Sequence, residues 1–347
     1  IETVRNALAD REALSVQAAN AARHFKRHYT WPKISQKFAE AIDKLLSDAP
    51  LSPAPAVLVL NDYDPFATVG GGSTRIRGLY EGASTSVRPI MLTFTEGDTI
   101  VRREVFGGKG LAISVPKTAE HRQRDGVQAS EFHVSTVDLV AMEFAPLNPL
   151  LRAIQRAAAN FAGIVASEHP YMASLLLDGP SKFVYSSQNC ESALKHQLLQ
   201  YHPRARELLS AVEKIERFCI ACSELVVAVS HNDAATFAAN NDLLAPLVVI
   251  ENGAEEPIMP AKPVARMSGF NVCFLGSGHL PNYMAVKWLL DEICPTLPEV
   301  TFHIAGSVCD GFDAVPENVV LHGFLDDSAK THLLLGCQMA LNPMAEG

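Results

Sequence analysis

The sequence predicts an α/β protein made of two doubly wound units. Short, nearly all-apolar segments alternate with helical stretches through residues 56–347, which is the pattern of parallel strands covered by helices on both faces. A proline-rich stretch with little periodicity, residues 255–265, interrupts this alternation. Each half opens with a strand followed by a glycine turn. Two separate α/β units in one chain explain all three observations.

The first 47 residues predict a pair of helices rather than an α/β unit. One helix spans about Asp10–His28, and a second begins after Thr30, a residue suited to cap a helix N-terminus. The second helix repeats apolar residues at helical spacing, at Ile34, Phe38, Ile42 and Leu45. That apolar stripe needs a covering surface. Residues 48–55 then form a proline-rich linker.

The first α/β unit is expected to span residues 56–253. Its strand candidates are Ala56–Asn61, Val87–Phe94, Leu111–Val115, Gly163–Ser167, Phe183–Ser186, Leu225–Val229 and Leu247–Ile250. A helix is expected from about Thr74, and others at Pro149–Phe161 and Arg204–Cys222.

The second α/β unit is expected to span residues 266–347. Its strand candidates are Asn271–Leu275, Thr301–Ala305, Val319–His322 and Met339–Asn342, with helices at Tyr283–Ile293 and Asp327–Leu335. The last residues read as a strand that runs into an acidic, glycine-bearing loop, and ligands bind at such loops in open α/β sheets. We therefore expect this unit to be incomplete and the chain to be a fragment.

The composition indicates a globular, cytoplasmic protein. Apolar residues make up 48% of the chain and charged residues 19%, and the net charge of −9 argues against a nucleic-acid partner. No apolar run reaches the ~18 residues of a membrane-spanning helix. The seven cysteines fit no disulfide framework. Cys219 and Cys222 form a C-x-x-C pair, but no second pair lies at zinc-site spacing, so we expect no metal site there.

Two glycine turns are candidate phosphate sites. Gly70-Gly71-Gly72-Ser73 and Gly276-Ser277-Gly278 each stand between a strand and a helix. Glycine lets the backbone approach a ligand, and a helix N-terminus offers free N–H donors to an anion. Facing each other across a cleft, the two turns would be placed to hold a diphosphate. Flexible surface turns are the alternative interpretation.

Polar residues follow several predicted strands. Ser167-Glu168-His169-Pro170 places a histidine where it could act as a base, bind an acceptor or lie exposed in a loop. Residues 186–191 fit either a site or helix capping by Asn189. Glu251-Asn252-Gly253 reads first as a tight turn. No motif of a serine nucleophile or a metal site is present.

In combination these segments resemble the GT-B glycosyltransferases, specifically the retaining group-1 (family 4) class. Residues 61–65 with Gly70–Gly72 look like the first strand and glycine loop of that family, and residues 185–191 look like its Asn-x-Glu element. Val229-Ser230 and residues 249–253 look like the end of its N-terminal domain. Its C-terminal domain is matched in order by residues 274–277, 281–282, 304–306, 321–324 and 342–347. The resemblance covers residues 54–347.

The resemblance implies two Rossmann-like domains that face each other across a cleft, with the nucleotide sugar in the C-terminal one. It implies catalytic roles for His169 and Glu346 and an acceptor side at Asn189 and Glu191. The implied donor-binding residues are Gly71, Gly72, Gly276, Ser277, Gly306, Gly323, Phe324 and Gly347. It implies no cofactor and no metal, and a nucleotide diphosphate sugar as the donor substrate.

The sequence departs from this family at two places. Gly278-His279-Leu280 stands where many members carry a basic pair, and the acidic segment expected after Gly347 lies beyond the sequence. Residues 1–47 look like the closing helices of the same family, which would make them the end of a preceding transferase domain. A private N-terminal extension is the alternative.

These observations predict a hexosyltransferase of polysaccharide or cell-envelope glycan synthesis, inactive as this fragment alone. Its partners would be a nucleotide-sugar donor and a glycan or lipid-linked acceptor, the latter with peripheral association at the inner face of the membrane. A nucleotide-sugar 2-epimerase and a non-catalytic binding half of a tandem protein are the alternatives.

Overall fold

The computed structural model describes residues 2–46, 55–68, 70–132, 136–177, 182–199, 205–240, 243–256, 264–278 and 280–343. The chain divides into two compact units. Unit 1 comprises Ile1–Ala22 and Pro257–Gly347, and unit 2 comprises Arg23–Glu256. The predicted linker at residues 48–55 lies almost entirely outside the described residues.

Unit 2 is built on an eight-stranded sheet with the order β3-β4-β2-β1-β5-β6-β7-β8. All neighbouring strands are parallel except the edge pair β3 and β4. The strands are β1 (Ala56–Leu60), β2 (Arg88–Thr95), β3 (Val101–Val105), β4 (Gly110–Pro116), β5 (Ala162–Glu168), β6 (Phe183–Ser186), β7 (Leu225–Ala228) and β8 (Leu247–Val249). β1 and β5 are neighbours, and the chain leaves them toward opposite edges of the sheet.

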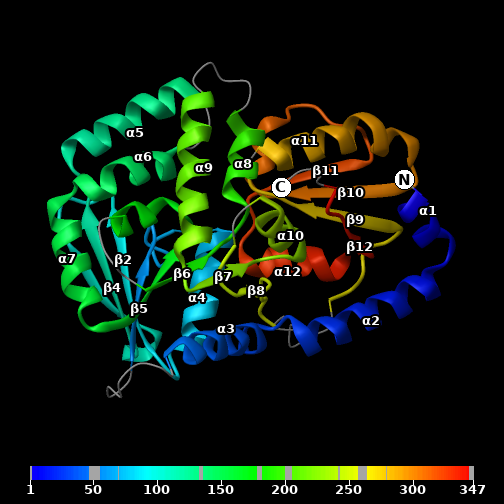
Figure 1. Ribbon diagram of the computed structural model, residues 1–347. Helices are drawn as coiled ribbons and strands as arrows, with labels where there is room; N and C mark the ends of the chain where they lie inside the picture. The colour runs from blue at the N-terminus through cyan, green and yellow to red at the C-terminus, as the bar shows by residue number, and fades with distance from the viewer. Residues whose placement is uncertain are drawn as a thin grey trace. The chain divides into compact units, whose positions relative to one another are not determined.

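Helices cover both faces of this sheet, as the continuous apolar strands predict (Figure 1). Val57 and Val59 of β1 face one core, and Leu58 and Leu60 face the other. The first face is covered by α3 (Trp31–Leu46) and α4 (Gly71–Ala83). The second is covered mainly by α6 (Val137–Phe144), α7 (Pro149–Ala159), α9 (Ala205–Cys222) and α10 (His231–Asn240). The remaining helices of the unit are α5 (Ala119–Phe132) and α8 (Glu191–Leu199).

Unit 1 holds a four-stranded parallel sheet with the order β11-β10-β9-β12. Its strands are β9 (Phe270–Leu275), β10 (Val300–Ala305), β11 (Val319–Gly323) and β12 (Met339–Ala340). One face of this sheet packs against α11 (Leu280–Trp288) and against Val4 and Ala7 of α1 (Glu2–Ala9). The other face is covered by α12 (Asp327–Gly336). α2 (Arg11–His28) begins in this unit and ends in unit 2.

The amphipathic second helix of the N-terminal pair is part of unit 2. Its predicted apolar stripe is buried, because Ile34, Phe38 and Ile42 of α3 pack against α4 and the sheet. Assignment of residues 1–47 to a preceding transferase stays a prediction, but the described residues of α3 fold here as one layer of the unit 2 core.

Two local expectations were wrong. β3 was not predicted, because Arg102, Arg103 and Glu104 give it no apolar run. α4 begins at Gly71 rather than near Thr74.

Thr30 directly precedes α3, at the position expected of its N-cap, and its carbonyl accepts the N–H of Ile34 at 3.1 Å. Thr30 also forms an isolated bridge to Ala254, so it ties the start of α3 to the segment after β8.

Close packing of α3 depends on two glycines that flank the Trp31 ring. A Cβ added at Gly78 of α4, or at Gly253 after β8, would overlap the indole. Over-packing of a filled core typically costs about 1–3 kcal/mol. The glycines are therefore required by packing, not by backbone conformation.

We expect Gly78→Ala to lower the free energy of unfolding by about 1–3 kcal/mol, measured by urea unfolding. In a Trp31→Ala background the same substitution should cost almost nothing further, because the ring that it clashes with is gone. Gly126→Ala on α5 is the matched control: it meets open space and should be neutral or stabilising. An equal loss with and without Trp31 would contradict this packing.

Candidate functional site

The carboxyl ends of β1 and β5 form a topological switch point in unit 2. Leu60 pairs with Ser167, so the residues that follow each strand emerge side by side. Asn61 and Asp62 follow β1, while Glu168 ends β5 and His169 follows it. Ligands of open α/β sheets bind at such points. This edge is therefore the first candidate site.

His169 and Glu191 form a buried ion pair at this edge. Nδ1 of His169 lies 3.0 Å from Oε1 of Glu191, which starts α8, and the hydroxyl of Tyr171 donates to Oε2 at 2.7 Å. Nδ2 of Asn189 also donates to Glu191, at 3.3 Å. The fold thus brings together His169, Asn189 and Glu191, as the sequence analysis proposed.

The protonation states of the pair follow from their contact. Burial would lower the pKa of His169, but the hydrogen bond and charge of Glu191 raise it to about 9. Burial would raise the pKa of Glu191, but His169 lowers it to about 2. At neutral pH the pair is therefore an imidazolium and a carboxylate. His169 has φ of 65°, a left-handed conformation that non-glycine residues rarely adopt.

Glu216 of α9 holds the start of α8 and so positions Glu191. Its Oε1 accepts the backbone N–H of Glu191 at 2.7 Å, and its Oε2 accepts that of Ser192 at 3.0 Å. Tyr185 also donates to it, at 3.0 Å. Asn189 does not cap the helix as expected, because its side chain contacts Glu191 while Glu216 receives the free N–H groups.

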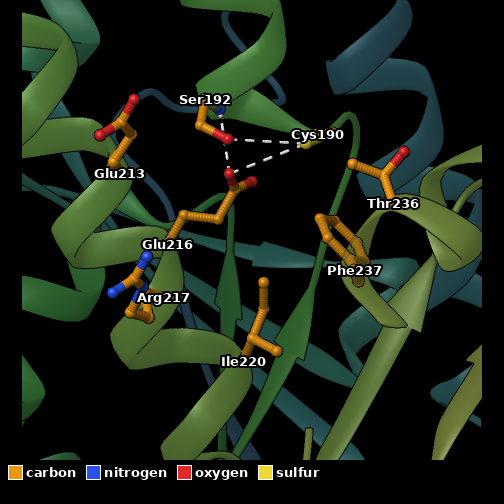
Figure 2. Close-up of a pocket in the computed structure, with 8 residues that line it drawn as sticks. All are labelled: Cys190, Ser192, Glu213, Glu216, Arg217, Ile220, Thr236 and Phe237. Atoms are coloured by element: carbon orange, nitrogen blue, oxygen red, sulfur yellow. Dashed lines mark hydrogen bonds between the residues drawn. The ribbon is translucent and has the colours of Figure 1, made fainter. Parts of the chain in front are cut away.

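A pocket of about 290 Å³ lies behind this capping contact. In Figure 2 Glu216 points toward Ser192 and Cys190, and Phe237 closes part of the opposite wall. Cys190 lies 3.9 Å from Glu216, and burial raises the pKa of its thiol. The residues that line this pocket include Glu216 but neither Asp62 nor His169. The pocket therefore borders the positioning carboxylate rather than the switch point.

Asp62 was not selected by the sequence analysis, although it belongs to the motif after β1. It is 7% exposed, and its Oδ1 has no hydrogen-bond partner among the described residues. Burial raises the pKa of its carboxyl to about 6, against the opposing effect of His169. Perturbed carboxyls in clefts are functional candidates.

Glu168 is a second buried carboxylate at this edge. It accepts the hydroxyl of Tyr80 at 2.8 Å, and burial raises its pKa although Arg75 opposes the shift. Arg75 in turn donates to the carbonyl of Ile250 at 2.9 Å and to Oδ1 of Asn252 at 3.1 Å. The Glu251-Asn252-Gly253 turn is thus tied to α4.

The predicted glycine turn of unit 2 lies against the same edge. Gly71 and Gly72 are the first residues of α4. A Cβ at Gly72 would overlap the Tyr63 hydroxyl and the Gln188 amide. The absence of a side chain at Gly72 therefore lets α4 begin beside these two polar groups.

The predicted donor residues of unit 1 also gather at the carboxyl ends of their strands. Gly276 donates its N–H to Ala305 at 2.9 Å, and Gly306 donates to Gly323 at 2.7 Å. Gly306 has φ of 106°, and a Cβ there would overlap the carbonyl oxygen of Gly276. Asn282 of α11 donates to Ser277 at 3.0 Å. Phe324 follows β11 and is 85% exposed.

Two of the predicted residues, Glu346 and Gly347, lie outside the described residues. Within the described ranges, no group of His, Cys, Asp and Glu side chains could hold a metal ion. Across the same ranges, no helix combines the length and apolar character needed to span a bilayer.

We expect Asp62→Asn to stabilise the protein at pH 8. Folding raises the pKa of this carboxyl from its ordinary 3.8 to about 6, so the group is harder to ionise in the folded protein than in the unfolded chain. Ionised Asp62 therefore opposes folding above pH 6, by up to about 3 kcal/mol. Urea unfolding should show this gain at pH 8 and its disappearance below pH 4.

Asp64→Asn is the matched control for that measurement. The Asp64 oxygens accept hydrogen bonds from the N–H of Phe66 and the hydroxyl of Ser114, and the carboxylate forms an ion pair with Arg103. This substitution should therefore destabilise. A loss of stability in Asp62→Asn at pH 8 would contradict the burial that we assign to Asp62.

We expect Glu191→Gln to lower the pKa of His169 well below about 9, because burial lowers it and the largest opposing effects, the hydrogen bond and charge of Glu191, are removed. This leaves only the charges of Asp62 and Glu168 to raise the pKa. NMR titration of the imidazole measures it. The wild-type His169 contribution to stability is present below pH 6.5 and is lost as the pH rises through about 9. Glu213→Gln, on α9, should leave the titration unchanged, and a pKa still near 9 in Glu191→Gln would refute the pairing.

No family model matches the sequence, and a search of curated proteins finds no match. Solved structures do match in fold. Sucrose-phosphate synthase from Thermosynechococcus elongatus has a TM-score of 0.61 at 12% identity, over 84% of this chain and 75% of that one. The catalytic domain of starch synthase IV from Arabidopsis thaliana has a TM-score of 0.53 at 12% identity, over 85% and 79%. This chain has the fold of the GT-B glycosyltransferases.

Proposed function

We propose that the protein is a glycosyltransferase that moves a sugar from a nucleoside diphosphate sugar to a hydroxyl of an acceptor. The observation that carries this proposal is the GT-B fold shared with two solved glycosyltransferases. Fold alone does not fix chemistry.

Unit 1 offers a surface suited to a diphosphate. β9 is followed by the Gly276 turn and then by the N-terminus of α11, whose free N–H groups and dipole favour an anion. The Ser307 hydroxyl accepts the N–H of Gly278 at 2.9 Å, which fixes the turn beside the next strand. Gly276, Ser277 and Gly306 would then contact the diphosphate, and Gly323 and Phe324 the nucleoside.

The chemistry that we propose is retaining hexosyl transfer in glycan synthesis. The bond from the anomeric carbon to the diphosphate breaks, the bond to the acceptor oxygen forms, and the acceptor proton leaves with the nucleoside diphosphate. Backbone donors and a helix N-terminus can stabilise the charge that develops on the leaving group. His169, for which the resemblance implies a catalytic role, lies in unit 2 and is an imidazolium at neutral pH.

Two of the residues that we propose at the donor sugar, Glu346 and Gly347, lie outside the described residues. The full natural protein, called the uninterrupted protein below, is therefore tested beside the 347-residue chain.

We expect Gly306→Ala to abolish stabilisation of the protein by nucleoside diphosphate sugars in thermal-shift titrations. An added Cβ would push the ends of β9 and β10 apart at the proposed diphosphate site. Gly269→Ala is the matched control, since Gly269 has φ of 83° but precedes β9 at its opposite end and meets open space. It should cost stability yet leave donor binding intact.

The wild-type titration decides the proposal itself. Stabilisation by at least one of the UDP-, ADP- or GDP-sugars is expected, with release of the free nucleoside diphosphate. No response to any of these donors from the uninterrupted protein would contradict the proposed function.

A further inference from the structure

Buried polar atoms without partners gather at the switch point of unit 2. They include Oδ1 of Asn61, Oδ1 of Asp62, Oε2 of Glu168, Oγ of Ser186 and Nε2 of Gln188, and none of these atoms finds a hydrogen-bond partner in the described part of the chain. Asn61, Asp62 and Gln188 are 1%, 7% and 8% exposed. These three follow β1 and β6, the strands on either side of β5.

Such atoms are rarely left unpaired together. Each buried group without a partner costs about 1–3 kcal/mol, and native proteins keep few of them. Neighbouring polar groups in the same unit are satisfied: Asp64 has three protein partners, and Glu216 has backbone and hydroxyl donors. Other unpaired buried atoms of the described chain lie on α5, at His121, Asp125 and Gln128 among others, and at Ser223. The set at the switch point is the one that lies where a ligand of this fold would bind.

The set has a definite chemical preference. The oxygens of Asn61, Asp62 and Glu168 are acceptors, Nε2 of Gln188 is a donor, and the Ser186 hydroxyl can be either. Asp62 carries a negative charge when ionised. Nearby charges do not reverse this sign, because His169 is paired with Glu191 and Lys195 is paired with Asp138. A ligand rich in hydroxyl groups can donate to these acceptors and accept from Gln188. A phosphate or carboxylate offers mainly acceptors and would face Asp62.

Side chains at the rim of this edge are partly exposed. Tyr63 and Asn189 are half-buried, and the His169 side chain keeps 13% of its surface exposed. An aromatic ring beside hydrogen-bonding groups suits the apolar face and polar rim of a sugar ring.

We propose that Asp62, with Asn61 and Gln188, binds the hydroxyl groups of a neutral acceptor sugar and selects against phosphorylated or acidic acceptors. Asp62 thereby determines specificity without entering the bond-breaking step. This inference rests on the proposed glycosyl transfer and names the acceptor class for it.

The test uses the uninterrupted protein and matched sugar pairs. Neutral mono- and disaccharides are compared with their 6-phosphates by saturation-transfer NMR and by ligand titration. We expect wild type to bind the neutral sugars at least about tenfold more tightly, a difference of about 1.4 kcal/mol. In Asp62→Asn that preference should shrink to about threefold or less, since the variant keeps the shape but loses the charge.

Asp64→Asn, two residues along the same loop, is the control and should keep the wild-type preference. Equal or tighter binding of the phosphates by wild type would overturn the proposal. So would an unchanged preference in Asp62→Asn, or no binding of any neutral sugar. Nucleoside diphosphate release is measured in the same preparations. Donor turnover with the wrong acceptor preference refutes only the acceptor class, whereas no donor turnover refutes the transferase itself.

Discussion

The candidate site in unit 2 depends on four buried carboxylates at one edge of its sheet. Asp62, Glu168, Glu191 and Glu216 are all less than a tenth exposed. A buried charge is costly unless it is paired or hydrogen-bonded. The four carboxylates meet that requirement to different degrees, and the difference divides the edge into supporting and functional groups.

Two of the carboxylates have both oxygens occupied by the protein. Glu216 receives the N-terminal N–H groups of α8, which places Glu191. Glu191 pairs with His169 and so fixes the imidazole as a cation beside β5. Glu168 takes the hydroxyl of Tyr80 on one oxygen, and its other oxygen has no partner among the described residues. Asp62 likewise keeps an unpaired oxygen and a raised pKa, but no side-chain hydroxyl within the described ranges donates to it, as expected of a group kept for a ligand rather than for stability.

The sequence predicts the architecture well, because buried parallel strands are short apolar runs bounded by turns. The strands from β5 to β11 were placed within about two residues on that basis. β3 was missed because Arg102 and Glu104 are exposed and Arg103 pairs with Asp64, so this antiparallel edge strand has no apolar run. The start of α4 was misplaced because glycine disfavours helices, and only the contact of Gly72 with Tyr63 and Gln188 shows why it is there.

The candidate site was only partly predictable. His169, Asn189 and Glu191 follow strands, and carboxyl ends of parallel strands meet at one edge, so their proximity could be inferred. Glu216 stands 25 residues after Glu191 within an amphipathic helix, and no local pattern marks it as a cap. The burial that sets Asp62 apart from Asp64 is likewise a property of the fold, although both stand in one short motif.

The central claim is glycosyl transfer, and product analysis tests it most directly. The uninterrupted protein would be incubated with a nucleoside diphosphate sugar and a neutral sugar acceptor, and the mixture followed by proton and phosphorus NMR. The account predicts one new glycoside for each nucleoside diphosphate released, with the anomeric configuration of the donor kept. A donor sugar that is epimerised but not transferred, or no conversion of any donor, would contradict it.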